Sequence, residues 1–207
     1  MSVVNLRVSV PVCGFKKSYA REFLESERVP PPATVYGFLL AMVGEEDRRE
    51  YIGTRLALGI TRTPEVSTIL RTSWRIKNKK MPLGTGNNKR PDYQEILTGL
   101  EIAVFVDEGE LADRLRRCRD WGSISRYGGL SLGESRDLVD EVALFPNWDQ
   151  QEADWLVADN TGDLPLPIWV DHIGSKGTNW GQFRLAKMPL ETPDREDPRW
   201  VSILPPP

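Results

Sequence analysis

The order of strand-like and helix-like segments constrains this chain most. Residues 3–12 alternate between apolar side chains at the even positions and mostly polar ones at the odd positions, which is typical of a half-buried strand. Three prolines at 30–32 precede a nearly all-apolar stretch, 35–43, which Gly44 closes. We expect a short buried helix there, with the glycine just beyond its end. Residues 55–63 alternate again and predict a second strand.

The same alternation of elements repeats further along the chain. Residues 96–106 predict a third strand, of which 102–106 is apolar enough to be central. Residues 110–121 predict a helix with Leu111, Leu115 and Cys118 on one face, and 138–145 predict a fourth strand. The order βαββαβ predicts an α+β, ferredoxin-like fold.

Two regions fall outside this pattern. Residues 66–80 predict the arm of a strand that outgrows the core, and 81–93 are rich in Gly, Asn and Pro, which is typical of a hairpin tip. We therefore expect a β-hairpin insert at about 66–95 within a domain spanning 1–145. Five of the seven tryptophans follow Pro146, so 146–207 predict a small β-rich appendage that packs through aromatic side chains and ends in an extended tail.

Charge is distributed very unevenly along the chain. The net charge is −3, yet the segment 71–91 has seven basic residues and no acidic one. These are Arg71, Arg75, Lys77, Lys79, Lys80, Lys89 and Arg90. The segment 137–175, in contrast, has nine carboxylates and no Lys or Arg. Such a chain presents a local positive field to a polyanion, and the alternative is a solvated loop in which the charges cluster by chance.

Several classes of protein are excluded. No apolar run is long enough to cross a membrane, and the first residues lack the pattern of a secretory signal. Cys13 and Cys118 are too few for a disulfide framework or a zinc site, so we expect a cytoplasmic protein. His172 is the single histidine, which excludes a histidine-cluster metal site. We expect no metal, no cofactor, no small-molecule substrate and no membrane partner.

Two further segments could contact phosphates. The first is glycine-rich, and its candidate residues are Arg126, Tyr127, Gly128, Gly129, Ser131 and Gly133. Glycines let a backbone approach a sugar-phosphate closely, and free amides and hydroxyls can donate to it; the alternative is an ordinary turn before a strand. The second is the loop after the first strand, with Lys16, Lys17, Ser18 and Tyr19, for which the alternative is an exposed basic loop.

Three motifs resemble those of CRISPR-associated family five. The stretch 29–44, V-P-P-P-A-T-V-Y-G-F-L-L-A-M-V-G, is similar to the P-P-[ST/AT]-x-x-G-[MF]-L signature of that family. Tyr51-Ile52-Gly53 precedes a strand as it does there. The segment 129–135, G-L-S-L-G-E-S, stands where these proteins have the glycine-rich loop of the RAMP superfamily. The resemblance covers about residues 1–145 and is closest to the DevS-like (MYXAN) branch found with type I-B systems.

The resemblance implies a non-catalytic subunit of a type I Cascade surveillance complex. It implies an RRM-related core with a β-hairpin thumb, which coincides with the basic insert. It also implies capture of the 5′ handle of the CRISPR RNA (crRNA), contacts with the backbone subunit and the large subunit, and only indirect contact with target DNA. The third strand offers only Phe105 where RRM domains have several aromatic side chains, so we do not expect base stacking on the sheet.

Two other functions remain open on the sequence. In the type I-C branch, the same family cuts precursor crRNA without a metal, through a Tyr, Lys and His constellation. Tyr19 with Lys16 or Lys17 could supply two of these groups, but the neighbouring Lys-His pair is absent and His172 is remote. The second alternative is a protein-only adaptor, which the uninterrupted basic insert disfavours.

Overall fold

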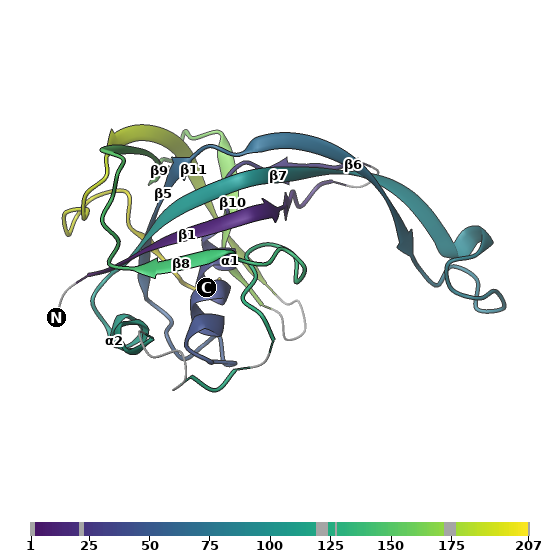
Figure 1. The fold of residues 1–207 in the computed structure, drawn as a ribbon, viewed down its shortest axis with the longest axis horizontal. Helices are drawn as coiled ribbons and strands as arrows, with labels where there is room; N and C mark the ends of the chain where they lie inside the picture. Colours follow the sequence, from purple (N-terminus) through teal and green to yellow (C-terminus); the bar gives the residue numbers. More distant parts are fainter. Residues whose placement is uncertain (1–2, 21–22, 119–123, 127, 172–176, 207) are drawn as a thin grey trace.

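The computed structural model describes residues 3–20, 23–118, 124–126, 128–171 and 177–206, and its fold is mixed α/β (Figure 1). The described residues form one large, mostly antiparallel ten-stranded sheet. Its strands are β1 (Val4–Cys13), β3 (Phe23–Leu24), β5 (Arg55–Arg62), β6 (Glu65–Trp74), β7 (Lys89–Val106), β8 (Glu141–Leu144), β9 (Glu152–Ala158), β10 (Leu164–Val170), β11 (Thr178–Pro189) and β12 (Val201–Ser202). A small separate ribbon pairs β2 (Phe15–Lys16) with β4 (Ser26–Glu27).

The strands predicted at 3–12, 55–63 and 96–106 are confirmed as neighbours in the middle of this sheet. Its main path runs β10-β11-β9-β5-β7-β1-β8. Leu6 and Leu58 both pair with Val104, so alternate apolar side chains of three strands lie in rows on one face. The fourth predicted strand is shorter than expected and covers only β8. The C-terminal strands β9, β10 and β11 extend the same sheet beyond β5.

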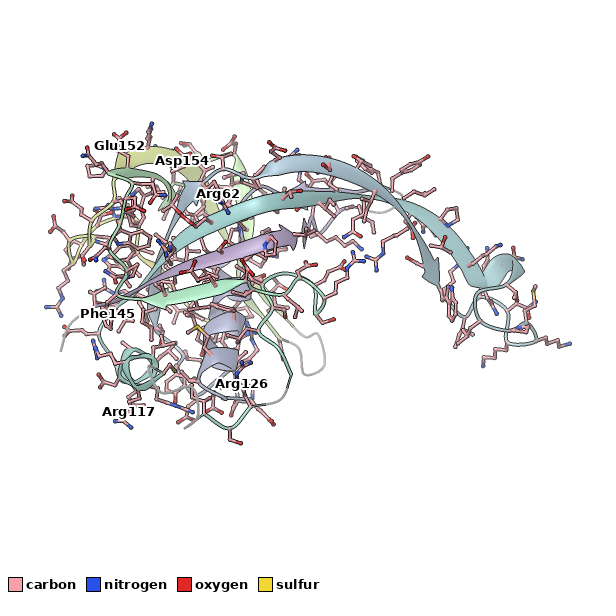
Figure 2. All side chains as sticks on the ribbon, viewed as in Figure 1. Arg62, Arg117, Arg126, Phe145, Glu152 and Asp154 are labelled. Atoms are coloured by element: carbon pink, nitrogen blue, oxygen red, sulfur yellow. The ribbon has the colours of Figure 1, made fainter. Side chains whose placement is uncertain are left out.

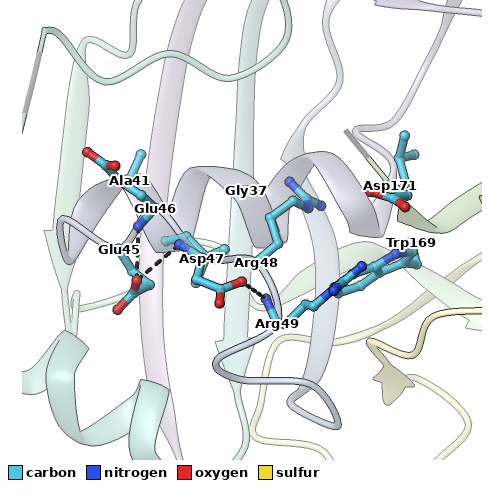
Figure 3. Close-up of a pocket in the computed structure, with 11 residues that line it drawn as sticks. Gly37, Ala41, Glu45, Glu46, Asp47, Arg48, Arg49, Trp169 and Asp171 are labelled. Carbon is cyan, nitrogen blue, oxygen red and sulfur yellow. Dashed lines mark hydrogen bonds between the residues drawn. The ribbon is translucent and has the colours of Figure 1, made fainter. Parts of the chain in front are cut away.

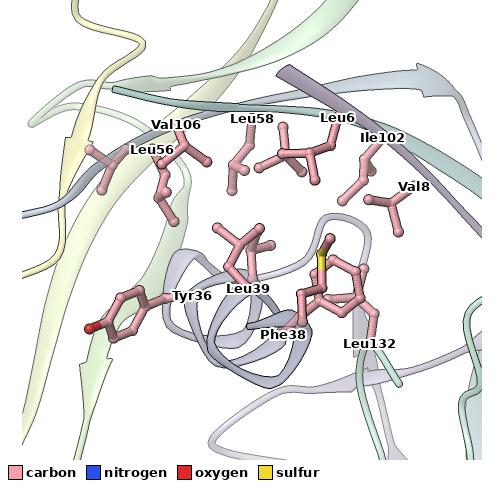
Figure 4. Packing of buried hydrophobic residues seen from close by; sticks show 14 of the residues in the cluster. Leu6, Val8, Tyr36, Phe38, Leu39, Leu56, Leu58, Ile102, Val106 and Leu132 are labelled. Atoms are coloured by element: carbon pink, nitrogen blue, oxygen red, sulfur yellow. The ribbon is translucent and has the colours of Figure 1, made fainter. Parts of the chain in front are cut away.

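Helix α1 (Pro32–Met42) packs against this apolar face (Figure 4). It begins at Pro32, because proline suits the first turn, where its missing N–H is not needed. Tyr36 and Leu39 are fully buried beneath the strands. Gly44 has the positive φ of +69° expected beyond a helix end, and a Cβ there would lie 2.2 Å from the Ser125 carbonyl oxygen. The predicted helix and its glycine stop are therefore confirmed, but the helix starts at Pro32, three residues before the predicted start at 35.

The second predicted helix is also present, as α2 (Glu110–Arg117). Leu111 and Leu115 are buried, and Cys118 follows in the same core. The last three residues predicted for this helix lie outside the described part of the chain. Among the described residues, no helix combines the length and the apolar character that a membrane span requires.

The opposite face of the sheet is covered by the C-terminal segment. Phe105 stacks on Trp148 at 6.4 Å between ring centroids and tilts against Trp155 at 5.4 Å. Trp200 belongs to the same apolar cluster as Phe105 and Trp155, whereas Ile203 is fully buried in the core beneath the sheet that also contains α1. Because Phe105 is only 1% exposed, it offers no surface on which a base could stack, as the sequence led us to expect.

The hairpin of β6 and β7 projects from the body (Figure 1). β6 ends at Trp74 and β7 starts at Lys89, so the strand predicted at 66–80 is shorter than expected and the third strand is longer. The reason is Asn88, in the short 3-10 helix η1 (Gly86–Asn88). Its side-chain oxygen accepts from the amides of Lys77 and Asn78, and its side-chain nitrogen donates to the carbonyls of Asn78 and Met81. These bonds fold residues 75–88 into a defined tip.

Candidate nucleic-acid interface

The tip and edges of the hairpin carry cations without acidic partners. Arg75, Lys77, Lys79, Lys80 and Lys89 are exposed, and none of them forms an ion pair with another described residue. Figure 2 shows that the side chains of this region extend away from the body into solvent. Five adjacent, uncompensated charges on a projecting arm can neutralise phosphates of a flexible strand.

Two of the seven predicted basic residues have a different role. The Arg90 Nε lies 2.5 Å from Asp92 Oδ1. Arg71 Nη1 donates to Gln94 Oε1 at 2.6 Å and lies 3.1 Å from Glu134 Oε2. Arg71 therefore ties the hairpin to the glycine-rich segment, and the charge of Arg90 is compensated by Asp92 on its own strand.

The glycine-rich segment folds into a tight loop beside the base of the hairpin. Ser131 bridges Leu138, and the Leu132 amide donates to the Asp137 carbonyl. Asp137 is the anchor: its Oδ2 accepts from the amides of Glu134 (2.8 Å) and Gly14 (3.1 Å). Burial raises the pKa of this carboxyl. The loop is thereby attached to the end of β1.

The glycines of this loop differ in what their backbones require. Gly133 has φ +120°, and a Cβ there would lie 2.6 Å from Asp137 Oδ2 and 3.0 Å from the Gly14 carbonyl oxygen. Gly128 also has positive φ, +70°, but its Cβ would meet nothing within 4 Å. A Cβ at Gly129 would lie 3.2 Å from Leu138 Cδ2. Gly133 is thus needed for packing, whereas Gly128 leaves an open backbone surface.

The remaining predicted residues of this segment are only partly placed. Arg126 is exposed and its Nη1 donates to the Gly128 carbonyl at 3.0 Å, so its guanidinium lies beside the open glycine. Tyr127 lies outside the described residues.

The basic loop after β1 lies close to the same place. Lys16, Ser18 and Tyr19 are exposed. The Lys17 ammonium lies 5.7 Å from the centre of the Tyr19 ring, and a hydrogen bond to Tyr19 raises the pKa of Lys17. Lys17 therefore remains a cation at neutral pH.

This loop is anchored through the ribbon of β2 and β4. The Phe15 amide donates to Ser26 Oγ, and the Ser26 amide donates to Glu95 Oε2 on β7. The structure thus brings the loop after β1 and residues 131–137 of the glycine-rich segment to the base of the hairpin. The unpaired cations of the insert lie at its far tip, and Arg126 lies away from the hairpin (Figure 2).

Sequence reasoning missed the residues that assemble this site. Gln94 lies 40 residues before Glu134, and no motif links it to Glu134 or to the neighbouring Asp137. Asn88 was recognisable as a turn residue, but not as the buried side chain that organises the tip. Among the described residues, no group of three or more His, Cys, Asp and Glu side chains is arranged to hold a metal ion.

Known proteins resemble this chain in sequence and in structure. No protein-family model matches it. The CRISPR-associated protein Cas5 of Myxococcus xanthus (strain DK1622) is 41% identical over 196 residues, covering 90% of this chain and 91% of that protein. A chain of a CRISPR RNA-guided surveillance complex superposes with a TM-score of 0.65 over 95% of this chain and 96% of its own length, at 13% identity. A Cas protein in a crystal structure gives 0.54 over 90% and 95%, at 12% identity. At this sequence identity and coverage, the chain belongs to the Cas5 family of CRISPR-associated proteins.

Proposed function

We propose that this protein is a non-catalytic subunit of a type I CRISPR surveillance complex, Cascade, and that it binds the 5′ handle of the crRNA. The observation that carries the proposal is the row of five exposed, unpaired cations on the projecting hairpin. The hairpin acts as the thumb, and the loop at Gly128 and the Lys16–Tyr19 segment form the adjoining contacts. Within the complex, the chain contacts the backbone subunit and the large subunit, and it meets target DNA only through the guide.

The arrangement of the core supports this assignment. We propose that β1, α1, β5, β7, α2 and β8 are a ferredoxin-like, RRM-related domain within residues 1–145. Its strands lie in the order β5-β7-β1-β8 with every neighbour antiparallel. Two helices, after β1 and after β7, make this order compatible with a βαββαβ chain. Residues 146–207 are the appendage, whose strands continue the sheet.

The proposal is tested by charge reversal on the hairpin. Binding of a 5′-handle RNA is measured for the purified chain and for a variant in which Arg75, Lys77, Lys79 and Lys80 are replaced by Glu. We expect the variant to lose measurable binding, because each cation that contacts a phosphate contributes through counterion release. Unchanged affinity would refute the assignment.

A matched control separates local from total charge. The double variant Lys79→Glu/Lys80→Glu is compared with Arg62→Glu/Arg117→Glu, which changes the charge equally on the body of the molecule (Figure 2). We expect only the hairpin variant to weaken binding strongly. Equal loss in both variants would indicate a nonspecific effect of net charge.

The second candidate function is cleavage of precursor crRNA, and the observation that favours it is the contact of Lys17 with Tyr19. A lysine beside a tyrosine could stabilise charge during attack by a 2′-hydroxyl. The third group, His172, lies outside the described residues. Incubation of the chain with repeat RNA, with and without EDTA, distinguishes the functions: we expect stable binding and no cut in either condition. A specific cut that persists in EDTA and disappears in Tyr19→Phe would establish the ribonuclease instead.

A further inference from the structure

The side of α1 that faces away from the sheet forms the floor of a groove (Figure 3). A hollow of about 580 Å³ lies between Gly37, Leu40 and Ala41 of α1, the turn 45–49, and residues 169–171 at the end of β10. A second hollow of about 290 Å³ shares Gly37 and Ala41 with it and reaches the glycine-rich loop. The first of these hollows is a groove along the exposed side of the helix.

Arg48 forms a fixed wall of this groove. Its guanidinium carbon lies 5.5 Å from the centre of the Tyr36 ring and 5.6 Å from that of Trp169, and its Nη2 donates to the Ala33 carbonyl at 3.0 Å. A Cβ at Gly37 would lie 2.9 Å from Arg48 Nη1, so a larger residue at position 37 would displace the guanidinium. The groove is therefore preformed and lined by apolar surface behind a rigid side chain.

The rim of the groove is acidic. Glu46 and Asp47 are exposed on the turn, and Asp171 lies on the opposite side. The turn is preorganised, because Glu45 Oε1 accepts from the amides of Glu46 and Asp47 at 3.0 Å each. Glu45 itself is paired with Arg114, whose Nη1 lies 2.8 Å from Glu45 Oε2, so Glu46 and Asp47 are the exposed carboxylates of this turn. The rim at Glu46 and Asp47 therefore favours a cation over a phosphate.

We propose that this groove binds a segment of a neighbouring protein subunit. That segment places an apolar side chain against the floor at the exposed Ala41, and a Lys or Arg beside Glu46 and Asp47. Charge complementarity identifies the occupant, since an apolar floor with an acidic rim fits a basic and apolar peptide but not RNA. The inference rests on the proposed function, because it requires that the chain works within a complex of several proteins.

Two variants block the groove in different ways. Ala41→Trp fills the floor from an exposed position of α1, and Glu46→Lys/Asp47→Lys reverses the rim. The tagged chain is purified from cells that also produce the other protein subunits of its complex and the crRNA. We expect either variant to reduce the recovery of one protein subunit by about tenfold or more, because blocking the centre of an interface removes its main contacts. Full recovery of every subunit in both variants would overturn the proposal.

Matched controls keep the result specific. Ile52→Trp and Glu50→Lys introduce the same bulk and charge at exposed positions outside the lining, and we expect full assembly with both. Handle-RNA affinity and melting temperature of each purified chain are measured in parallel. We expect the groove variants to keep the RNA affinity and the melting temperature of the wild type. Loss of RNA affinity together with loss of the subunit would contradict the proposal that the groove is separate from the RNA-binding surface.

A photo-crosslinker identifies the occupant directly. The change Ala41→p-benzoylphenylalanine places a reactive ketone in the groove of the assembled complex. Crosslinks to a protein peptide with Lys or Arg beside an apolar residue support the proposal, whereas crosslinks to RNA, or none, contradict it. Failure of the wild-type chain to bind handle RNA would refute the proposed function by itself and would not change how this crosslink is interpreted.

Discussion

Arg71 on β6 and Glu134 in the glycine-rich loop form an ion pair, with Nη1 3.1 Å from Oε2. Gln94 on β7 joins them, since Arg71 Nη1 donates to its side-chain oxygen and its nitrogen lies 3.2 Å from Glu134 Oε1. Arg136 contacts the same glutamate at 2.9 Å. The hairpin and the loop are thus held at a fixed relative position by one carboxylate.

A double-mutant cycle of Arg71→Ala and Glu134→Ala measures this coupling. We expect a coupling energy of about 0.5–1 kcal/mol in urea unfolding, because both side chains are about one-third exposed and water screens their attraction. RNA affinity should fall in both single variants, but the slope of affinity against salt should stay unchanged, because the Arg71 charge is already neutralised. A slope that becomes shallower in Arg71→Ala would show that Arg71 contacts a phosphate itself.

Single substitutions at the tip should behave differently. Lys77→Ala, Lys79→Ala and Lys80→Ala should each weaken handle binding by about 1 kcal/mol and reduce the salt slope by roughly 0.7 per lost phosphate contact. Arg90→Ala is the matched control, because its guanidinium pairs with Asp92. Salt titrations of RNA binding provide the measurement. If Arg90→Ala changes the slope as much as the lysine variants do, the distinction between the unpaired lysines and the paired Arg90 is wrong.

Substitutions in the glycine-rich loop should affect RNA binding at some positions and stability at others. Gly128→Val and Gly129→Val should obstruct close approach of the handle, and Gly128→Val should cost about 1–3 kcal/mol of stability, because a β-branched residue is strained at positive φ. Gly133→Ala should destabilise the fold more, because its Cβ would collide with Asp137 and with the Gly14 backbone. Thermal unfolding and RNA binding are compared for the three variants. Wild-type crRNA content in a complex assembled with Gly128→Val/Gly129→Val would mean that the loop is merely a turn.

Asp137 should make stability depend on pH. Burial raises its pKa in the folded protein above the usual value, so its contribution to stability is greatest when it is protonated and is lost as the pH rises through the folded-state pKa. Asp137→Asn does not titrate there and serves as the reference. The free energy of unfolding of wild type minus that of Asp137→Asn should decrease as the pH rises above the usual aspartate pKa of about 4. An increase instead would show that the two amide hydrogen bonds outweigh the burial.

The order of the core elements was predictable because each element has a recognisable pattern within its own segment of the sequence. Alternation in residues 3–12 and the apolar stretch before Gly44 identify a strand and a helix without knowledge of the rest. The placement of the C-terminal strands was not predictable. Gly59 in β5 pairs with Trp155 in β9, and a Cβ at Gly59 would lie 3.0 Å from the Ala153 Cβ. The sequence shows a glycine within a strand, but not which distant strand comes close to it.

The candidate site shows the same division. The segment 71–91 has seven basic residues and no acidic one, and this clustering of charge, which is visible in the sequence, predicted the charged hairpin. The sequence could not show that Arg71 and Arg90 are paired, because their partners Glu134 and Asp92 are assigned only by the fold. The same applies to Asp137, whose role depends on an amide more than a hundred residues away.

The C-terminal tail provides the last test. Five tryptophans follow Pro146, and they can be covered either by packing within the chain or by docking of this region on another subunit. In the structure, Val201 pairs with Leu56 of β5, Ile203 is fully buried, and Arg199 lies 4.7 Å from the centre of the Trp155 ring. Deletion of residues 189–207 should therefore yield an insoluble or unfolded chain, because each buried apolar side chain lost removes about 1.5–3 kcal/mol of stabilisation.

A shorter deletion separates folding from docking. Removal of residues 204–207 spares these contacts and takes away the exposed Leu204, so the chain should remain folded with a nearly unchanged melting temperature. Its assembly with the other subunits and crRNA is then measured by co-purification, beside the variant Trp180→Ser, because Trp180 is 46% exposed. Loss of a protein subunit with crRNA retained, in either variant, would establish docking through this region. An intact complex in both, together with an unfolded 189–207 deletion, would assign the tail to intramolecular packing alone.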